Sequence, residues 1–111
     1  MIDITIDAQN TAIVHVDGKI IGNTVVEFRQ ALQQQMDIGN SNLIIDLTNV
    51  PLLDSTALGV IIITLQILQR SEGKLVLLNP QQAVSSILEI TRLTTILEVY
   101  DSKEAALNAF T

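Results

Sequence analysis

The chain has 111 residues, of which 48% are hydrophobic and only 3% aromatic. That length is enough for one domain, and its core must be built mainly from Ile, Leu, Val and Ala. Twelve acidic and six basic residues give a net charge of −6, which disfavours nucleic acid and anionic lipid as direct ligands. The hydrophobic content excludes disorder, and the absence of cysteine excludes disulfides and thiolate metal sites.

No segment has the character of a membrane span or a signal peptide. The longest apolar stretch, residues 57–68, is interrupted by Gly59, Thr64 and Gln66 and is shorter than the roughly 20 residues that a bilayer requires. The N-terminus lacks a basic start followed by an apolar block. We therefore expect a soluble, cytoplasmic protein in which residues 1–111 form a single domain.

The first two predicted elements are strands. Residues 2–7 and 11–17 alternate between apolar and polar side chains, which is typical of half-buried strands. The connection at residues 8–10 is short enough for a hairpin, so the two strands are expected to pair antiparallel. His15 lies on the polar face of the second strand and is predicted to be solvated.

The hydrophobic period changes after Gly18. Thr24 and Glu27 have the spacing of a capping box and open a predicted helix over residues 24–37, which ends at Gly39. Its apolar side chains recur every three or four residues with polar side chains between them, which predicts an amphipathic helix.

A buried strand, a long helix and another strand follow. The strand is predicted at residues 43–47, with Asp46 inside it. Length and the lack of alternation favour a helix over residues 57–70, which Gly73 ends, and residues 74–78 form the next strand. The helix is mostly aliphatic, which indicates burial on more than one side or an apolar contact patch near its start.

The last third of the chain predicts a helix, a strand and a second helix. Asn79 and Pro80 give the first helix its cap and first turn. Residues 96–100 form a short strand, and Asp101 with Glu104 caps the final helix.

The resulting order is β-β-α-β-α-β-α-β-α. Strands joined by helices form right-handed crossovers and pair in parallel. The predicted fold class is therefore α/β: one domain with a mixed, mostly parallel sheet opened by an antiparallel hairpin, and about four helices.

The residue inventory argues against an enzyme. His15 is the only histidine, and no serine lies in a Gly-x-Ser-x-Gly elbow. No His or Cys cluster has the spacing of a metal site, and Gly18 and Gly22 are not followed by the Lys of a phosphate-binding loop. We expect no catalytic residue, no metal and no cofactor.

One segment stands out from this background. Asp54, Ser55 and Thr56 lie at the start of the long helix, where such side chains commonly cap free amides. Ser55 could instead accept a phosphate, which the helix N-terminus tolerates and which adds nearly two negative charges beside Asp54. Two unit charges about 5 Å apart repel by roughly 1 kcal/mol in water and about 3 kcal/mol at an effective dielectric of 20. Such repulsion would weaken a complex with a partner without unfolding the domain. From these residues alone, the segment is either a helix cap or a phosphorylation site.

The same segment carries a resemblance to a known family. Residues 43–60, with the block Asp-Ser-Thr-Ala-Leu-Gly at 54–59, resemble the signature of STAS domains, the family of the anti-sigma factor antagonists. Residues 84–93 and 99–106 are similar to the C-terminal pattern of that family. The resemblance covers nearly the whole chain and implies a STAS-like fold.

The resemblance implies a non-enzymatic partner-switch protein. In this family the unphosphorylated antagonist binds an anti-sigma factor that is also a serine kinase; phosphorylation breaks the complex and a phosphatase resets it. Carried over by position, Ser55 is the phosphate acceptor, Asp54 its acidic neighbour and Thr56 the adjacent hydroxyl. Leu58 and Gly59 continue the motif into the helix that helps form the docking surface.

Two positions depart from the family pattern. The family often has an Asp after its second strand where this chain has Ile21, and a Gly where it has Ala57. The absent carboxylate bears on recognition by the kinase. An alternative is therefore a STAS subunit that docks on a transport ATPase of the phospholipid-transport type. Ser55 and Thr56 would then serve as cap and contact residues without regulated phosphorylation.

Overall fold

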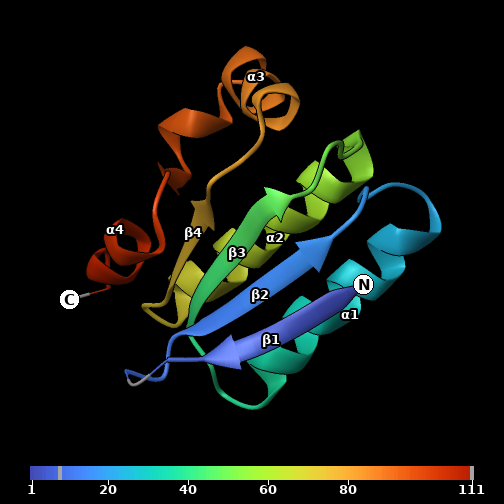
Figure 1. The fold of residues 1–111 in the computed structure, drawn as a ribbon. Coiled ribbons are helices and arrows are strands. Elements are labelled where there is room, and N and C mark those ends of the chain that lie inside the picture. Colours follow the sequence, from blue (N-terminus) through green and yellow to red (C-terminus); the bar gives the residue numbers. More distant parts are fainter. Residues whose placement is uncertain (8, 111) are drawn as a thin grey trace.

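The structure is a computed structural model and describes residues 1–7 and 9–110 (Figure 1). Its strands are β1 (Ile2–Ile6), β2 (Ala12–Asp17), β3 (Asn42–Asn49), β4 (Lys74–Leu78) and β5 (Glu98–Tyr100). Its helices are α1 (Asn23–Asp37), α2 (Ser55–Arg70), α3 (Gln82–Ile90) and α4 (Lys103–Asn108), and a single 3-10 turn, η1, covers Leu93–Thr95.

The five strands form one sheet in the order β1-β2-β3-β4-β5. β1 and β2 are antiparallel, and the three following pairs are parallel. This topology confirms the predicted α/β fold class and the antiparallel opening. The predicted hairpin connection at residues 8–10 includes Ala8, which lies outside the described residues. Within those residues, no helix is both long and apolar enough to cross a membrane.

Both faces of the sheet are packed, which explains why its central strands are nearly continuous apolar runs. Side chains such as Val14 and Ile45 contribute to the larger core cluster, together with side chains of α1, α2 and α3. The alternate side chains, such as Ile13 and Ile44, form a smaller cluster with Ala106 of α4. Helix α4 lies toward the β4 side of its face (Figure 1). On the β1 side of that face the side chains of Asp3 and Thr5 are exposed.

The start of α1 differs from the prediction. The helix begins at Asn23 after Gly22, whose φ of 54° and ψ of −121° suit glycine far better than other residues. The hydroxyl of Thr24 does not cap the helix: it accepts a hydrogen bond from the Ile21 amide at 2.8 Å. The predicted capping box of Thr24 and Glu27 is therefore wrong, because the helix begins one residue earlier, at Asn23, with Gly22 as its N-cap.

Two later helix starts are also corrected. Asn79 is not the cap of α3; it has a φ of 51°, and the helix follows Gln81 instead. The cap of α4 is Ser102, whose hydroxyl accepts from the Ala105 amide at 3.2 Å, and not Asp101.

The last strand is shorter than predicted. It begins at Glu98 and not at residue 96, because the preceding residues close the 3-10 turn and the Leu97 amide bonds to the Leu93 carbonyl at 2.9 Å.

Candidate functional site

The segment singled out by sequence lies at the carboxyl-terminal edge of the parallel strands, where the loops after β2 and β3 run side by side. The Ile20 amide donates to the Leu52 carbonyl at 3.0 Å, and the Asp54 amide donates to the Ile20 carbonyl at 3.2 Å. Ile20 and Leu53 form an isolated parallel bridge, and both side chains are buried. These contacts fix the start of α2 relative to the start of α1.

The Asp54 carboxylate joins the N-termini of two helices. Its Oδ1 accepts from the Ala57 amide in the first turn of α2 at 2.9 Å, and its Oδ2 accepts from the Gly22 amide at the start of α1 at 3.3 Å. A negative charge is favourable there because both helix N-termini carry partial positive charge. The expectation of a helix cap in this segment is confirmed, with Asp54 as the capping residue.

Ser55 and Thr56 follow the cap and are exposed. In the described part of the chain, neither hydroxyl has a hydrogen-bond partner. Gly59, one turn further along α2, is half-buried, and an added Cβ would have no atom within 4 Å of it. Leu58 is different: its side chain is buried in the core cluster and packs α2 against the domain.

The Ser55 hydroxyl is placed to accept a group. In the described chain the Ser55 hydroxyl makes no hydrogen bond, and Ile21, half-buried, precedes Gly22 where the family often has a carboxylate. Over residues 1–7 and 9–110, no group of three or more His, Cys, Asp or Glu side chains is placed to hold a metal ion. The chemistry available at this edge is that of an exposed, unpaired hydroxyl next to a fixed carboxylate.

A second polar cluster, which the sequence analysis missed, lies on the β1 side of the sheet face that α4 packs on. The ring of His15 bonds through Nδ1 to Asp46 Oδ2 at 2.8 Å and through Nε2 to Thr5 Oγ1 at 3.0 Å. Asp46 Oδ1 accepts from the amide and the hydroxyl of Thr48, at 3.0 and 2.6 Å. His15 lies on the polar face as predicted and its side chain is 35% exposed, but both ring nitrogens are hydrogen-bonded, which the sequence did not predict.

The sequence held no local signal for this cluster. His15 and Asp46 are 31 residues apart, and they become direct neighbours only through the parallel register of β2 and β3. Burial opposes ionisation of Asp46, but the hydrogen bonds from Thr48 and His15 outweigh it and hold the pKa of that carboxyl below its ordinary value. The cluster therefore ties β1, β2 and β3 together.

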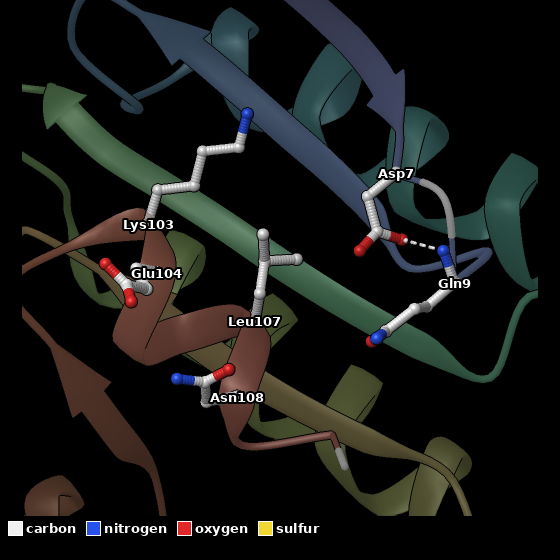
Figure 2. Close-up of a pocket in the computed structure, with 6 residues that line it drawn as sticks. All are labelled: Asp7, Gln9, Lys103, Glu104, Leu107 and Asn108. Atoms are coloured by element: carbon white, nitrogen blue, oxygen red, sulfur yellow. Dashed lines mark hydrogen bonds between the residues drawn. The ribbon is translucent and has the colours of Figure 1, made fainter.

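A cavity of about 510 Å³ lies at the hairpin end of the sheet, away from Ser55. Figure 2 shows its lining, which is Asp7, Gln9, Lys103, Glu104, Leu107 and Asn108. Asp7 and Gln9 come from the hairpin, and the others come from α4. The Asp7 carboxylate is already engaged, since it accepts from the Gln9 amide at 3.1 Å. The cavity therefore takes no part in the Ser55 site.

Comparisons with known proteins agree with this geometry. The STAS domain family model matches residues 3–106. The anti-sigma-B factor antagonist of Staphylococcus aureus (strain NCTC 8325 / PS 47) is 30% identical over 91 residues, covering 82% of this chain and 84% of that protein.

Two solved structures share the fold. An anti-sigma factor antagonist from Mycobacterium paratuberculosis has a TM-score of 0.88 and 24% identity, covering 98% of this chain and 92% of that one. The Bacillus cell fate determinant SpoIIAA in its phosphorylated form has a TM-score of 0.79 and 16% identity over the whole of both chains. Because the family model spans nearly all of the five-stranded fold and the Asp-Ser-Thr segment at its edge, the chain belongs to the STAS domain family.

Proposed function

We propose that this protein is an anti-sigma factor antagonist that works by partner switching. In its unphosphorylated form it binds an anti-sigma factor with serine kinase activity and so frees the sigma factor. Phosphorylation of Ser55 by that kinase dissociates the complex, and a phosphatase restores the binding form. The observation that carries the proposal is the exposed Ser55 hydroxyl, which is unpaired in the described chain at the start of α2.

The relatives support the same role. The Staphylococcus aureus relative is named an anti-sigma-B factor antagonist, and the SpoIIAA structure is of a phosphorylated protein. The site in this chain is suited to a kinase substrate, since the Ser55 hydroxyl is exposed and makes no hydrogen bond in the described chain. We accordingly propose that the chain itself is not an enzyme and needs no cofactor.

Electrostatic repulsion is the proposed basis of the switch. The Asp54 carboxylate is held in place by the amides of Ala57 and Gly22, so it cannot move away from a charge added at Ser55 without breaking these bonds. A phosphate there adds nearly two negative charges to a chain whose net charge is already −6. Asp54, Ser55, Thr56 and Gly59 form the proposed contact surface, with Leu58 supporting α2 from the core.

The test is affinity capture from native lysate with the wild-type chain, Ser55→Ala and Ser55→Asp as baits, followed by mass spectrometry of baits and partners. We expect wild type and Ser55→Ala to retain a serine kinase, and the kinase to phosphorylate Ser55 in wild type alone. Ser55→Asp should bind that kinase at least about tenfold more weakly, equivalent to about 1.4 kcal/mol. Thr56→Ala is the matched control, because it removes the adjacent exposed hydroxyl and should leave phosphorylation at Ser55.

The alternative function predicts a different result in the same experiment. Ile21 supplies an aliphatic side chain where the family often has Asp, which favours a docking subunit without regulated phosphorylation. Capture of a transport ATPase by wild type and Ser55→Asp alike, with Ser55 unmodified, would support that function and overturn the switch.

A further inference from the structure

Helices α1 and α2 leave an apolar groove between them that the switch at Ser55 does not use. Two cavities, of about 80 and 250 Å³, share Met36 of α1 and Ile67 of α2 as common walls. We call the two cavities together the α1–α2 groove. Its lining is Arg29, Gln33, Met36, Gly39, Asn40, Ser41, Val60, Ile63, Thr64, Ile67, Leu68 and Ser71.

The groove has exposed aliphatic side chains along one wall. Ile63 is 57% exposed and Ile67 is 37% exposed, although the domain buries most of its other aliphatic side chains. They lie four residues apart, so they are neighbours on the surface of α2. Gly59 and Ser55 continue the same four-residue row toward the start of the helix. The apolar wall is therefore continuous with the proposed contact surface at Ser55.

The charge of the groove is opposite to that of the chain. The net charge is −6, yet no acidic side chain lines either cavity. Arg29 stands at the α1 wall, and across residues 1–7 and 9–110 its guanidinium has no ion pair or hydrogen bond. An occupant that brings a carboxylate to Arg29 would complement this charge, whereas a basic occupant would be repelled.

We propose that the α1–α2 groove binds one amphipathic helix of the partner, with aliphatic residues on its inner face and a carboxylate directed at Arg29. The inference rests on the proposed function and adds the chemistry of the docking element to it. A groove between two helices offers side-chain walls and no free strand edge, which suits the binding of a helix. From Val60 to Ser71 the wall is about 17 Å long at about 1.5 Å per residue, which matches about three turns of helix.

This arrangement separates affinity from switching. Ile63 lies eight residues after Ser55, or about 12 Å along the axis of α2, so a helix in the groove does not need to touch the phosphorylation site. The groove binds the partner's helix by apolar contact, whereas the charge of a phosphate at Ser55 repels the rest of the partner.

A partner-independent selection tests the docking element. A library of helical peptides displayed on a rigid helical scaffold, with the outward positions randomised, is selected against the wild-type chain. We expect enriched peptides to carry Leu, Ile or Met at three- and four-residue spacing, with Asp or Glu near one end. They should bind Ile63→Ser at least tenfold more weakly than wild type. Peptides selected for binding to the Arg29→Glu variant should carry Lys or Arg in place of the acidic residue.

The controls separate this proposal from folding and from the switch. Ile90→Ser removes an isoleucine of α3 that is 80% exposed and should leave peptide binding unchanged. Peptide binding is measured on the unphosphorylated wild-type chain without any partner, so a positive result stands even if partner switching is disproved. Peptides that bind Ile63→Ser as tightly as wild type, or that show no acidic preference reversed by Arg29→Glu, would overturn the proposal. A wild-type dimer that Ile63→Ser dissociates would also overturn it, by assigning the groove to a second copy.

Discussion

The start of α2 and the cluster around His15 use the same kinds of side chain in opposite ways. At the start of α2 the Ser55 hydroxyl is exposed and has no partner in the described chain. On the sheet face Thr5, His15 and Asp46 are joined by hydrogen bonds of 3.0 and 2.8 Å. A group whose hydrogen bonds are made stabilises the fold, whereas an exposed group without partners is available for reaction. The two regions should therefore respond differently to mutation.

The largest effect on stability is expected from Asp46→Ala. This change leaves His15 and the Thr48 amide without their acceptor in a partly buried site, which should lower the free energy of unfolding by about 2 kcal/mol. Urea denaturation measures the loss. Capture of the partner should be unchanged, and a loss of partner binding at unchanged stability would contradict the division between the two regions.

Asp54→Ala should have a smaller effect on stability and a clear effect on both helix starts. It removes the acceptor of the Ala57 and Gly22 amides, and loss of such a cap costs about 1 kcal/mol. Asp54→Asn keeps a capping oxygen and removes the charge, so it should recover most of that stability. Hydrogen exchange at the two amides reports whether the cap is broken, and slow exchange in Asp54→Ala would show that the cap contributes nothing.

Acid titration isolates the contribution of Asp46. The pKa of this carboxyl is lower in the folded chain than in the unfolded chain, so its contribution is fully present above the unfolded value of about 4. That contribution is lost as the pH falls through the lower folded value. Stability measured at a series of pH values below about 4 should therefore fall more steeply in wild type than in Asp46→Asn. Parallel curves for the two proteins would contradict the role assigned to the cluster.

The smallest expected effect is that of Ser55→Ala. Because its hydroxyl has no described partner, the free energy of unfolding should change by less than about 0.5 kcal/mol. Thermal denaturation with Thr56→Ala as the matched control checks this. A loss of 1 kcal/mol or more would show that the hydroxyl is part of the fold.

Local patterns predicted the elements of the fold but not the contacts that depend on its topology. The sequence predicts β1 from the alternation in residues 2–7 and β3 from the apolar run at 43–47. Both predictions work because burial of one or both faces of a strand determines its pattern of apolar residues. The helix starts were less predictable. Gly22 opens α1 through a backbone conformation that no side-chain pattern encodes.

The candidate site was predictable in part. The sequence singles out Asp54, Ser55 and Thr56 because capping residues and hydroxyls cluster at one helix start. The burial of Leu58 was not predicted, since α2 is aliphatic on several sides and its phase against the core is set by packing. The contact between His15 and Asp46 depends on strand register, which is not visible in their 31-residue separation.

We propose that a phosphate on Ser55 controls partner binding. The most direct test of this proposal uses the full chain with phosphoserine incorporated at position 55 and measures the affinity of both forms for the purified serine kinase recovered by capture. We expect the phosphorylated form to bind at least about tenfold more weakly, with the free energy of unfolding of the two forms within about 0.5 kcal/mol. Equal affinities of the two forms for that kinase would contradict it.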